Sequence, residues 1–272
     1  MDFSTAFTDA GGKLVAQGLT IPLHLGSIPT ALEAVLAEFE GDIHPGDVFV
    51  INDPYHGGMH LPDVFIFKPI FVDGERVAFG ATISHQADMG GRVPGSNASD
   101  STEIFQEGLR IPPLKLYERG QPNETMWAMI ETNVRIPVQV TGDMRAQLSA
   151  CNIAERQFLE LVERFGLETT RHYMMAVIEY AERLARAGLR ELPDGEYSFE
   201  DWIDDDGIDR DQPIRLFCTI RKQGDAIQVD WDGSAPQVKG AINCTLSFTK
   251  AVSYAAVRSV LAFDIPCNEG LF

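Results

Sequence analysis

The sequence predicts an α+β fold in which a mixed sheet and strand hairpins accompany a pair of long antiparallel helices. Apolar runs at residues 64–72 and 76–84 flank Asp73-Gly74, a strong signal for a tight hairpin turn. Residues 144–165 and 169–189 show apolar side chains at helical spacing. With 272 residues, of which 44% are hydrophobic, the chain can bury one large core or two ordinary ones.

The first helix is expected over residues 27–39. Ser27 is a favourable N-cap, and Pro29 fits the first turn. The apolar residues from position 31 onward follow helical spacing, and Gly41 ends the segment. A short buried strand is expected next, over residues 47–51.

The hairpin turn also predicts which residues face each other. If Asp73-Gly74 forms a two-residue loop, Asp63 faces Ser84 on the other strand. His85 then faces Pro62, the residue before Asp63. Pro69 cannot donate a hydrogen bond to the ladder, and a bulge there would shift the register by one residue. Asp63 and His85 are adjacent in either register, about 4.5–5.5 Å apart at Cα when directly paired.

The two long helices are separated only by a short break at Gly166. So short a connection favours antiparallel packing of the helices. A further hairpin is expected from residues 214–221 and 226–231, and a final helix from residues 247–263. The apolar residues of that last helix surround most of its circumference, which predicts burial or association with a partner.

An acidic segment, Asp204-Asp205-Asp206-Gly207, lies between these elements. Its composition predicts an exposed loop. Three consecutive aspartates are compatible with a divalent-cation site, but a solvated turn is the favoured interpretation.

The composition excludes several classes of protein. Lys and Arg number 22 against 40 Asp and Glu, a net charge of −18, so nucleic acid is not an expected partner. No apolar run is long enough to span a membrane, and residues 1–4 do not resemble a signal peptide. The cysteines are scattered without a CxxC pair, which favours reduced thiols and a cytoplasmic location: Cys151, Cys218, Cys244 and Cys267.

Two glycine-rich loops, residues 52–63 and 84–96, carry most of the chemically reactive side chains. Long loops inside a compact domain are commonly functional. The predicted hairpin brings His60, Asp63 and His85 toward one point. Two imidazoles and a carboxylate are a typical ligand set for a catalytic divalent metal with an open coordination position.

The alternative is that each of these histidines only caps a loop backbone. The predicted convergence favours the metal site. The other histidines have no such argument: His44 is expected in a surface turn and His172 on a helix surface, and neither His24 nor His56 is placed near the site.

At the loops and beyond them, the chain resembles the hydantoinase B/oxoprolinase family, which includes the alpha subunit of acetone carboxylase. The resemblance is carried by DFS (2–4), PLHLGS (22–27), GDVFVINDPY (46–55), GGMHLPD (57–63), HQADMGG (85–91), PGS (94–96), EGLRIPP (107–113), GDMRAQ (142–147), DDDG (204–207) and IPCNEG (265–270). These segments run nearly from end to end of the chain.

The resemblance implies a metal site formed by Asp2, His60, Asp63 and His85. It adds Asp2 to the three residues that the hairpin register selects. Asp88 is a candidate catalytic residue together with His85, either as a general base or as a group that orients His85. Family members often have a second histidine where this chain has Gln86, so the metal stays open among zinc, manganese and iron.

The resemblance also implies a function. The chain is expected to be the metal-dependent subunit of an ATP-dependent hydrolase that opens a hydantoin, 5-oxoproline or lactam ring. ATP is expected only on a hydantoinase A-type partner, because the chain lacks a GxxxxGK[ST] phosphate loop. The alternatives are an acetone-carboxylase-like alpha subunit and a non-catalytic subunit stabilised by its metal.

We expect three domains: an α+β domain with the metal site over residues 1–142, a helical hairpin over 143–192, and a strand-rich segment ending in a helix over 193–272. Members of the family are about twice this length and have a helical segment before DFS. The chain is therefore expected to be an incomplete subunit that works in a hetero-oligomer.

Overall fold

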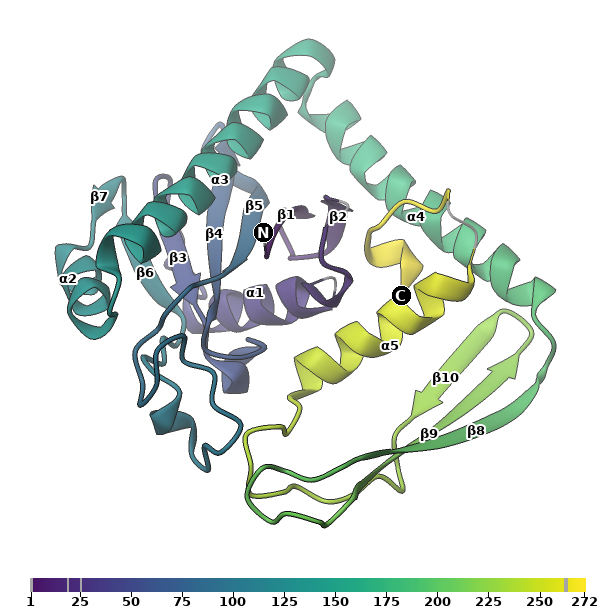
Figure 1. The fold of residues 1–272 in the computed structure, drawn as a ribbon. Helices are drawn as coiled ribbons and strands as arrows, with labels where there is room; N and C mark the ends of the chain where they lie inside the picture. Colours follow the sequence, from purple (N-terminus) through teal and green to yellow (C-terminus); the bar gives the residue numbers. More distant parts are fainter. Residues whose placement is uncertain (1, 19, 25, 262–263) are drawn as a thin grey trace.

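The computed structural model describes residues 2–18, 20–24, 26–261 and 264–272. Its centre is a seven-stranded sheet in the order β2-β1-β5-β4-β3-β6-β7 (Figure 1). The strands are β1 (Phe3–Asp9), β2 (Leu14–Gln17), β3 (Val48–Ile51), β4 (Asp63–Val72), β5 (Glu75–His85), β6 (Leu114–Glu118) and β7 (Gln121–Pro122). Every pairing among the described strands is antiparallel, so the α+β class is confirmed while the expected mixed sheet is an antiparallel one.

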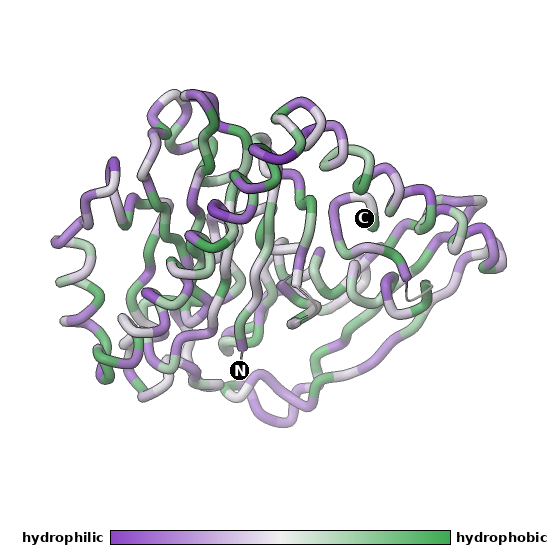
Figure 2. Tube along the Cα trace, turned by 90° about the horizontal axis from the view of Figure 1, so that it is seen from above, coloured by the Kyte–Doolittle hydropathy of each residue, from purple (hydrophilic) through white to green (hydrophobic). Residues whose placement is uncertain are grey.

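Helices cover both faces of this sheet, which explains why β4 and β5 are apolar on both sides. On one face α1 (Ser27–Glu38) packs its buried side chains against Phe49, Phe65, Phe67 and Phe79. On the other face α2 (Glu124–Asn133) and α3 (Pro137–Phe165) cover Val48, Val50, Val64 and Ile66. Viewed from above, the central strands carry long hydrophobic stretches between more hydrophilic outer segments (Figure 2).

Helix α1 begins one residue earlier than the capping pattern predicts. Gly26 is the N-cap, and Ser27 is the first helical residue. The buried Ser27 hydroxyl donates a hydrogen bond to the backbone oxygen of His24, at 3.0 Å, in the 3-10 turn η1 (Pro22–His24). Ser27 therefore joins α1 to the preceding turn, and its predicted capping role is wrong.

The two long helices are present, but they do not pack antiparallel. Gly166 separates α3 from α4 (Leu167–Glu191) with φ of 81°, as the predicted break requires. From there α3 lies over β4 and β5 while α4 reaches β2 and β10, so the helices diverge in a V (Figure 1). The apolar face of α3 packs mainly against β4 and β5, whereas the apolar face of α4 packs partly against β2 and mainly against the C-terminal segment with Leu261, Ile265 and Leu271. Helix α3 also begins at Pro137, so the expected domain boundary at residue 142 falls inside it.

A second, three-stranded antiparallel sheet follows, in the order β10-β9-β8. It contains β8 (Gly195–Ile203), β9 (Ile214–Gln223) and β10 (Ala226–Asp230), and the predicted β9–β10 hairpin is confirmed. Helix α5 (Leu246–Val260) comes next, followed by the 3-10 turn η4 (Glu269–Leu271). The end of the predicted helix at residues 262–263 lies outside the described residues.

Helix α5 is less buried than its sequence predicts. Only Ser247 and Ala251 are fully buried in it, whereas Leu246 and Val260 are exposed. The structure therefore does not have the expected burial of this helix within the chain, while the alternative expectation, association with a partner through its exposed apolar residues, stays a prediction. None of the described helices is long and apolar enough to span a membrane. All four cysteines are free thiols.

The acidic segment after β8 is not simply a solvated loop. Asp206 is buried, and its carboxylate accepts hydrogen bonds from the backbone N–H groups of Ile208 (2.9 Å), Asp209 (2.6 Å) and Gly240 (3.0 Å). These bonds tie the turn to a distant part of the chain. Asp206 therefore organises two loops, while the exposed Asp204 matches the expectation.

Candidate metal centre

The β4–β5 hairpin places two of the predicted ligands opposite each other. Asp63 pairs directly with His85 at the last position of the ladder. The register shifts by one residue between Ile70 and Phe71, because Val77 forms an extra position on β5 close to Pro69. The predicted alternative register, with one bulge, is the one that the structure has.

His60 joins this pair from the loop before β4. Its Nε2 lies 3.0 Å from Oδ2 of Asp63, and Nδ1 of His85 lies 3.0 Å from Oδ1 of the same carboxylate. The two imidazole nitrogens are 3.2 Å apart. His60, Asp63 and His85 are the one set of three potential ligand residues, among the residues described, whose donor atoms gather within 4.8 Å.

The loop that carries His60 is held in place by close backbone packing. Gly57 has φ of 93°, and a Cβ there would lie 2.6–2.7 Å from the backbone of Thr30 and Ala31 in α1. Asp53 accepts a hydrogen bond from the Tyr55 N–H and so caps the 3-10 turn η2 (Pro54–His56). The glycine at position 57 allows the loop to lie directly on α1, which fixes the approach of His60 to the sheet.

The electrostatics of the cluster follow from burial and hydrogen bonding. Burial of Asp63 would raise its pKa, but hydrogen bonds from His60 and His85 outweigh burial and lower the pKa to about 2. The hydrogen bond to Asp63 raises the pKa of His85 above its ordinary value. Asp63 is 3% exposed, while the side chains of His60 and His85 are 36% and 28% exposed. The centre is thus anchored on a buried anion and open to solvent at the imidazoles.

These donors suit a divalent transition metal. Donor atoms bound tetrahedrally at the usual 2.0–2.1 Å from zinc lie about 3.3 Å apart. The two imidazole nitrogens are 3.2 Å apart here, and each lies 3.0 Å from one of the two Asp63 oxygens. Two neutral imidazoles and one carboxylate are also acceptable to manganese and iron. A fourth position on the exposed side would remain for water or substrate.

Asp2 lies beside the cluster, and the structure also brings in a histidine that the sequence argument missed. The backbone oxygen of Asp2 accepts a hydrogen bond from the His85 N–H, at 3.0 Å. Its half-exposed carboxylate lies 3.6 Å from Nε2 of His24. His24 is buried, its Nδ1 lies 2.7 Å from the Ser4 hydroxyl, and burial lowers its pKa.

His24 comes close to the centre because β1 pairs with β5. The register places Phe3 opposite Ser84, and η1 then returns His24 beneath Ser4. No local pattern in the sequence predicts this contact. The one signal for His24 is that it lies in PLHLGS (22–27), a segment that carries the family resemblance. His44 and His56 behave as expected, with partners outside the cluster in Asp42 and Asp53.

The hydrogen bonds of the Asp88 carboxylate go to groups other than His85. The buried carboxylate accepts hydrogen bonds from the Arg135 guanidinium and backbone (both 2.7 Å), and from the N–H groups of Gly90 (3.2 Å) and Gly95 (3.1 Å). Burial would raise its pKa, but these bonds lower it. Asp88 therefore holds the loop that leaves His85 against the start of α3, with its oxygens fully engaged.

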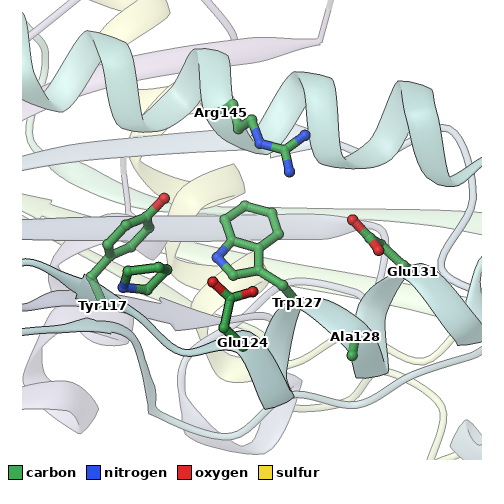
Figure 3. A pocket seen from close by; sticks show the side chains of 7 residues that line it. Tyr117, Glu124, Trp127, Ala128, Glu131 and Arg145 are labelled. Atoms are coloured by element: carbon green, nitrogen blue, oxygen red, sulfur yellow. The ribbon is translucent and has the colours of Figure 1, made fainter.

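Two hollows lie away from this cluster. One, of about 260 Å³, is formed by β6, β7, α2 and α3, where the Arg145 guanidinium lies over the Trp127 ring at 5.1 Å (Figure 3). The other, of about 460 Å³, lies between the three-stranded sheet and α5, and Trp231 and Phe248 are part of its mainly apolar lining. Neither hollow includes a residue of the metal cluster.

The fold and the cluster define a class: an α+β protein with a candidate divalent-metal centre at the open end of a β-hairpin. The particular family follows from comparison with known proteins. The chain belongs to the hydantoinase B/oxoprolinase family, whose sequence model matches residues 1–272. This membership confirms the resemblance that the sequence motifs indicate.

Relatives in the family include enzymes of known activity. The chain is 35% identical to the caprolactamase subunit beta of Pseudomonas jessenii, over 100% of this chain and 46% of that protein. It is 31% identical to the 5-oxoprolinase of Saccharomyces cerevisiae, over 99% of this chain and 22% of that protein. The chain therefore spans about half the length of the caprolactamase subunit and less of the longer relative.

Solved structures share the fold. The crystal structure of ATP-dependent caprolactamase from Pseudomonas jessenii superposes with a TM-score of 0.92 at 35% identity, over 99% of this chain and 46% of that chain. A nucleotide-free acetone carboxylase structure superposes with a TM-score of 0.91 at 19% identity, over 99% and 38% of the two chains. The second comparison shows the shared fold alone.

The lowered pKa of Asp63 predicts an acid-sensitive fold in the metal-free chain. A carboxyl whose pKa falls from 3.8 to about 2 on folding contributes stability that is complete above about pH 5 and is lost progressively as the pH falls toward 2. The loss should reach about 2 kcal/mol. His85 acts in the opposite sense, since its raised pKa contributes stability below 6.5 that is lost as the pH rises.

Urea unfolding with a chelator present, between pH 5 and pH 2.5, measures this loss. Asp63→Asn should flatten the dependence, while Asp73→Asn in the exposed turn should keep the wild-type curve. An Asp63→Asn chain with the same acid sensitivity as wild type would contradict the assignment.

Proposed function

We propose that this chain carries the divalent-metal centre of an ATP-dependent cyclic-amide hydrolase and works with a hydantoinase A-type subunit that uses ATP. The convergence of His60, Asp63 and His85 carries the proposal. Membership of a family that includes a caprolactamase subunit and 5-oxoprolinases supports the substrate class of lactams, hydantoins and 5-oxoproline. The net charge of the chain is −18, which opposes binding of a negatively charged nucleotide and so fits an ATP site on the partner subunit.

The residues of the chain would divide the work. His60, Asp63 and His85 would bind the ion, and Asp2 is the candidate for a further ligand once its carboxylate turns from His24. A bound divalent ion lowers the pKa of a coordinated water from 15.7 to about 7, which supplies a nucleophile at neutral pH. Asp88 would act with Arg135 by holding the loop that follows His85, rather than by taking a proton.

A carboxylase function like that of acetone carboxylase is the second candidate. It is kept because the sequence motifs resemble those of a family that includes the alpha subunit of acetone carboxylase. The same ligand set would then hold an activated enol and carbon dioxide instead of delivering water. A non-catalytic subunit with a structural metal is a third outcome, and an exchangeable ligand position on the exposed side of the cluster would argue against it.

Alanine substitutions should rank the ligands. His60→Ala, Asp63→Ala and His85→Ala should each remove most of the bound metal, because each deletes one of three or four donors. Asp88→Asn should weaken metal affinity or activity by about 10- to 100-fold, as expected for a group that supports a ligand. Elemental analysis of the purified variants measures the stoichiometry.

The matched controls are His44→Ala and His56→Ala, whose partners lie outside the cluster, and both should keep the wild-type metal content. Full metal in both His60→Ala and His85→Ala would show that the cluster is not the metal site. If Asp2→Ala alone among the ligand variants keeps its metal, the site has three protein ligands.

The proposed reaction is tested in the assembled complex with its A-type subunit. Hydantoin, 5-oxoproline and ε-caprolactam should be opened only when ATP, the A-type subunit and the divalent metal are all present. Ring opening is measured by chromatography of the amino-acid product. Carboxylation of acetone by the same complex, without ring opening, would contradict hydrolysis and support the second candidate.

A further inference from the structure

Glu107 differs from the buried acids of this protein because its carboxylate has no partner. Within the described part of the chain it accepts no hydrogen bond and forms no ion pair, although the side chain is partly buried. The nearby arginines pair elsewhere, Arg92 with Asp100 and Arg110 with Asp53. Each of the fully buried acids does accept hydrogen bonds: Asp47, Asp53, Asp63, Asp88 and Asp206.

One buried side chain holds the Glu107 segment beside the His60 loop. The Asn52 amide donates hydrogen bonds to the backbone oxygens of Leu61, at 2.7 Å, and Leu109, at 2.9 Å. Its Oδ1 accepts a hydrogen bond from the Ile111 N–H, at 2.6 Å. Since Leu61 follows His60 and Leu109 lies two residues after Glu107, Asn52 fixes these two stretches of chain side by side.

The loop that leaves His85 holds the same segment from another side. The Leu109 N–H donates to the backbone oxygen of Met89 (2.7 Å), and the Arg92 N–H donates to that of Gln106 (2.9 Å). The two bonds flank Glu107. Gly108, with φ of 140°, permits this contact, because a Cβ there would lie 2.3 Å from the Met89 oxygen. Glu107 is thus fixed to the loops of two metal-cluster histidines.

The electrostatics agree with this placement. Burial raises the pKa of Glu107, and the charge of His60 acts in the opposite direction to lower it. A carboxylate that lacks hydrogen-bond donors accepts a proton more readily than one held by several donors, such as Asp88.

We infer that Glu107 is the catalytic residue that transfers protons at this centre, an inference that rests on the proposed function. In an amide activated by phosphorylation on oxygen, the bond from the reacting carbon to the ring nitrogen is a double bond. The water oxygen bonds to that carbon, one water proton passes to the Glu107 carboxylate, and the π electron pair moves to the ring nitrogen. Glu107 returns this proton to the nitrogen and is again a carboxylate. The carbon–nitrogen bond then breaks with its electron pair going to the nitrogen, and the hydroxyl group on the carbon gives its proton to the same nitrogen. This leaves the amine and an acyl phosphate, which a second water hydrolyses to the carboxylate and inorganic phosphate.

The isosteric variant Glu107→Gln tests the role in the assembled complex, with ATP and the three cyclic amides as probes. The turnover number should fall by about 10²- to 10⁴-fold, the usual contribution of a positioned acid or base. Metal affinity, measured by calorimetric titration of zinc or manganese into the metal-free protein, should stay at the wild-type value. Glu118→Gln, on an exposed glutamate at the end of β6, is the matched control and should change neither quantity.

Chemical rescue separates proton transfer from a structural role. Added formate should restore part of the turnover lost in Glu107→Ala, because a small carboxylate can occupy the space and accept the proton. Wild-type turnover in Glu107→Gln, loss of metal affinity in that variant, or an absence of rescue would each overturn the inference.

The same assay shows when the proposed function fails instead. If the wild-type complex opens none of the three amides, or if His60→Ala turns them over normally, hydrolysis at this centre is wrong and the Glu107 role is wrong with it. If His60→Ala abolishes turnover while Glu107→Gln does not, only the inference about Glu107 is wrong.

Discussion

The antiparallel pairing of β4 with β5 is the constraint on which the rest of this structure depends. It creates the two central strands of the sheet, whose apolar faces are then covered by α1 on one side and α2 and α3 on the other. The same pairing ends with Asp63 opposite His85, so the register that buries the core also assembles the candidate metal centre. Because side chains alternate between the faces of a strand, a slip of one residue would disturb the core and the centre together.

Around that hairpin, buried polar side chains hold the loops that strand pairing cannot hold. Asn52 joins the His60 loop to the segment after Glu107, and Asp88 with Arg135 fixes the loop that leaves His85. Each of these side chains bonds to backbone groups that would otherwise be buried without partners, which is costly inside a protein. The positions of His60 and His85 therefore depend on side chains that do not belong to the metal cluster.

Local signals in the sequence were enough to predict the hairpin, two alternative registers and three cluster residues, because turn chemistry and strand alternation act over short distances. The arrangement of α3 and α4 was not predictable in this way. Gly166 marks the break, but the direction of each helix depends on what its apolar face meets. Helix α3 lies on β4 and β5, whereas α4 packs mainly against the C-terminal segment that contains Leu261, Ile265 and Leu271. His24, the Asp206 turn and the place of Glu107 likewise depend on contacts between residues far apart in the chain, which composition and spacing do not report.

The central claim is that His60, Asp63 and His85 bind one metal ion because the β4–β5 register brings them together. X-ray absorption spectroscopy of the metal-loaded protein tests it most directly, since imidazole ligands give a distinctive scattering pattern. The account predicts two imidazole nitrogens together with carboxylate oxygen at about 2.0–2.2 Å from the metal, as expected for zinc. His85→Ala should lose most of its metal, and the metal that stays bound should have one imidazole fewer. A bound metal without imidazole scattering, or with an unchanged spectrum in His85→Ala, would contradict it.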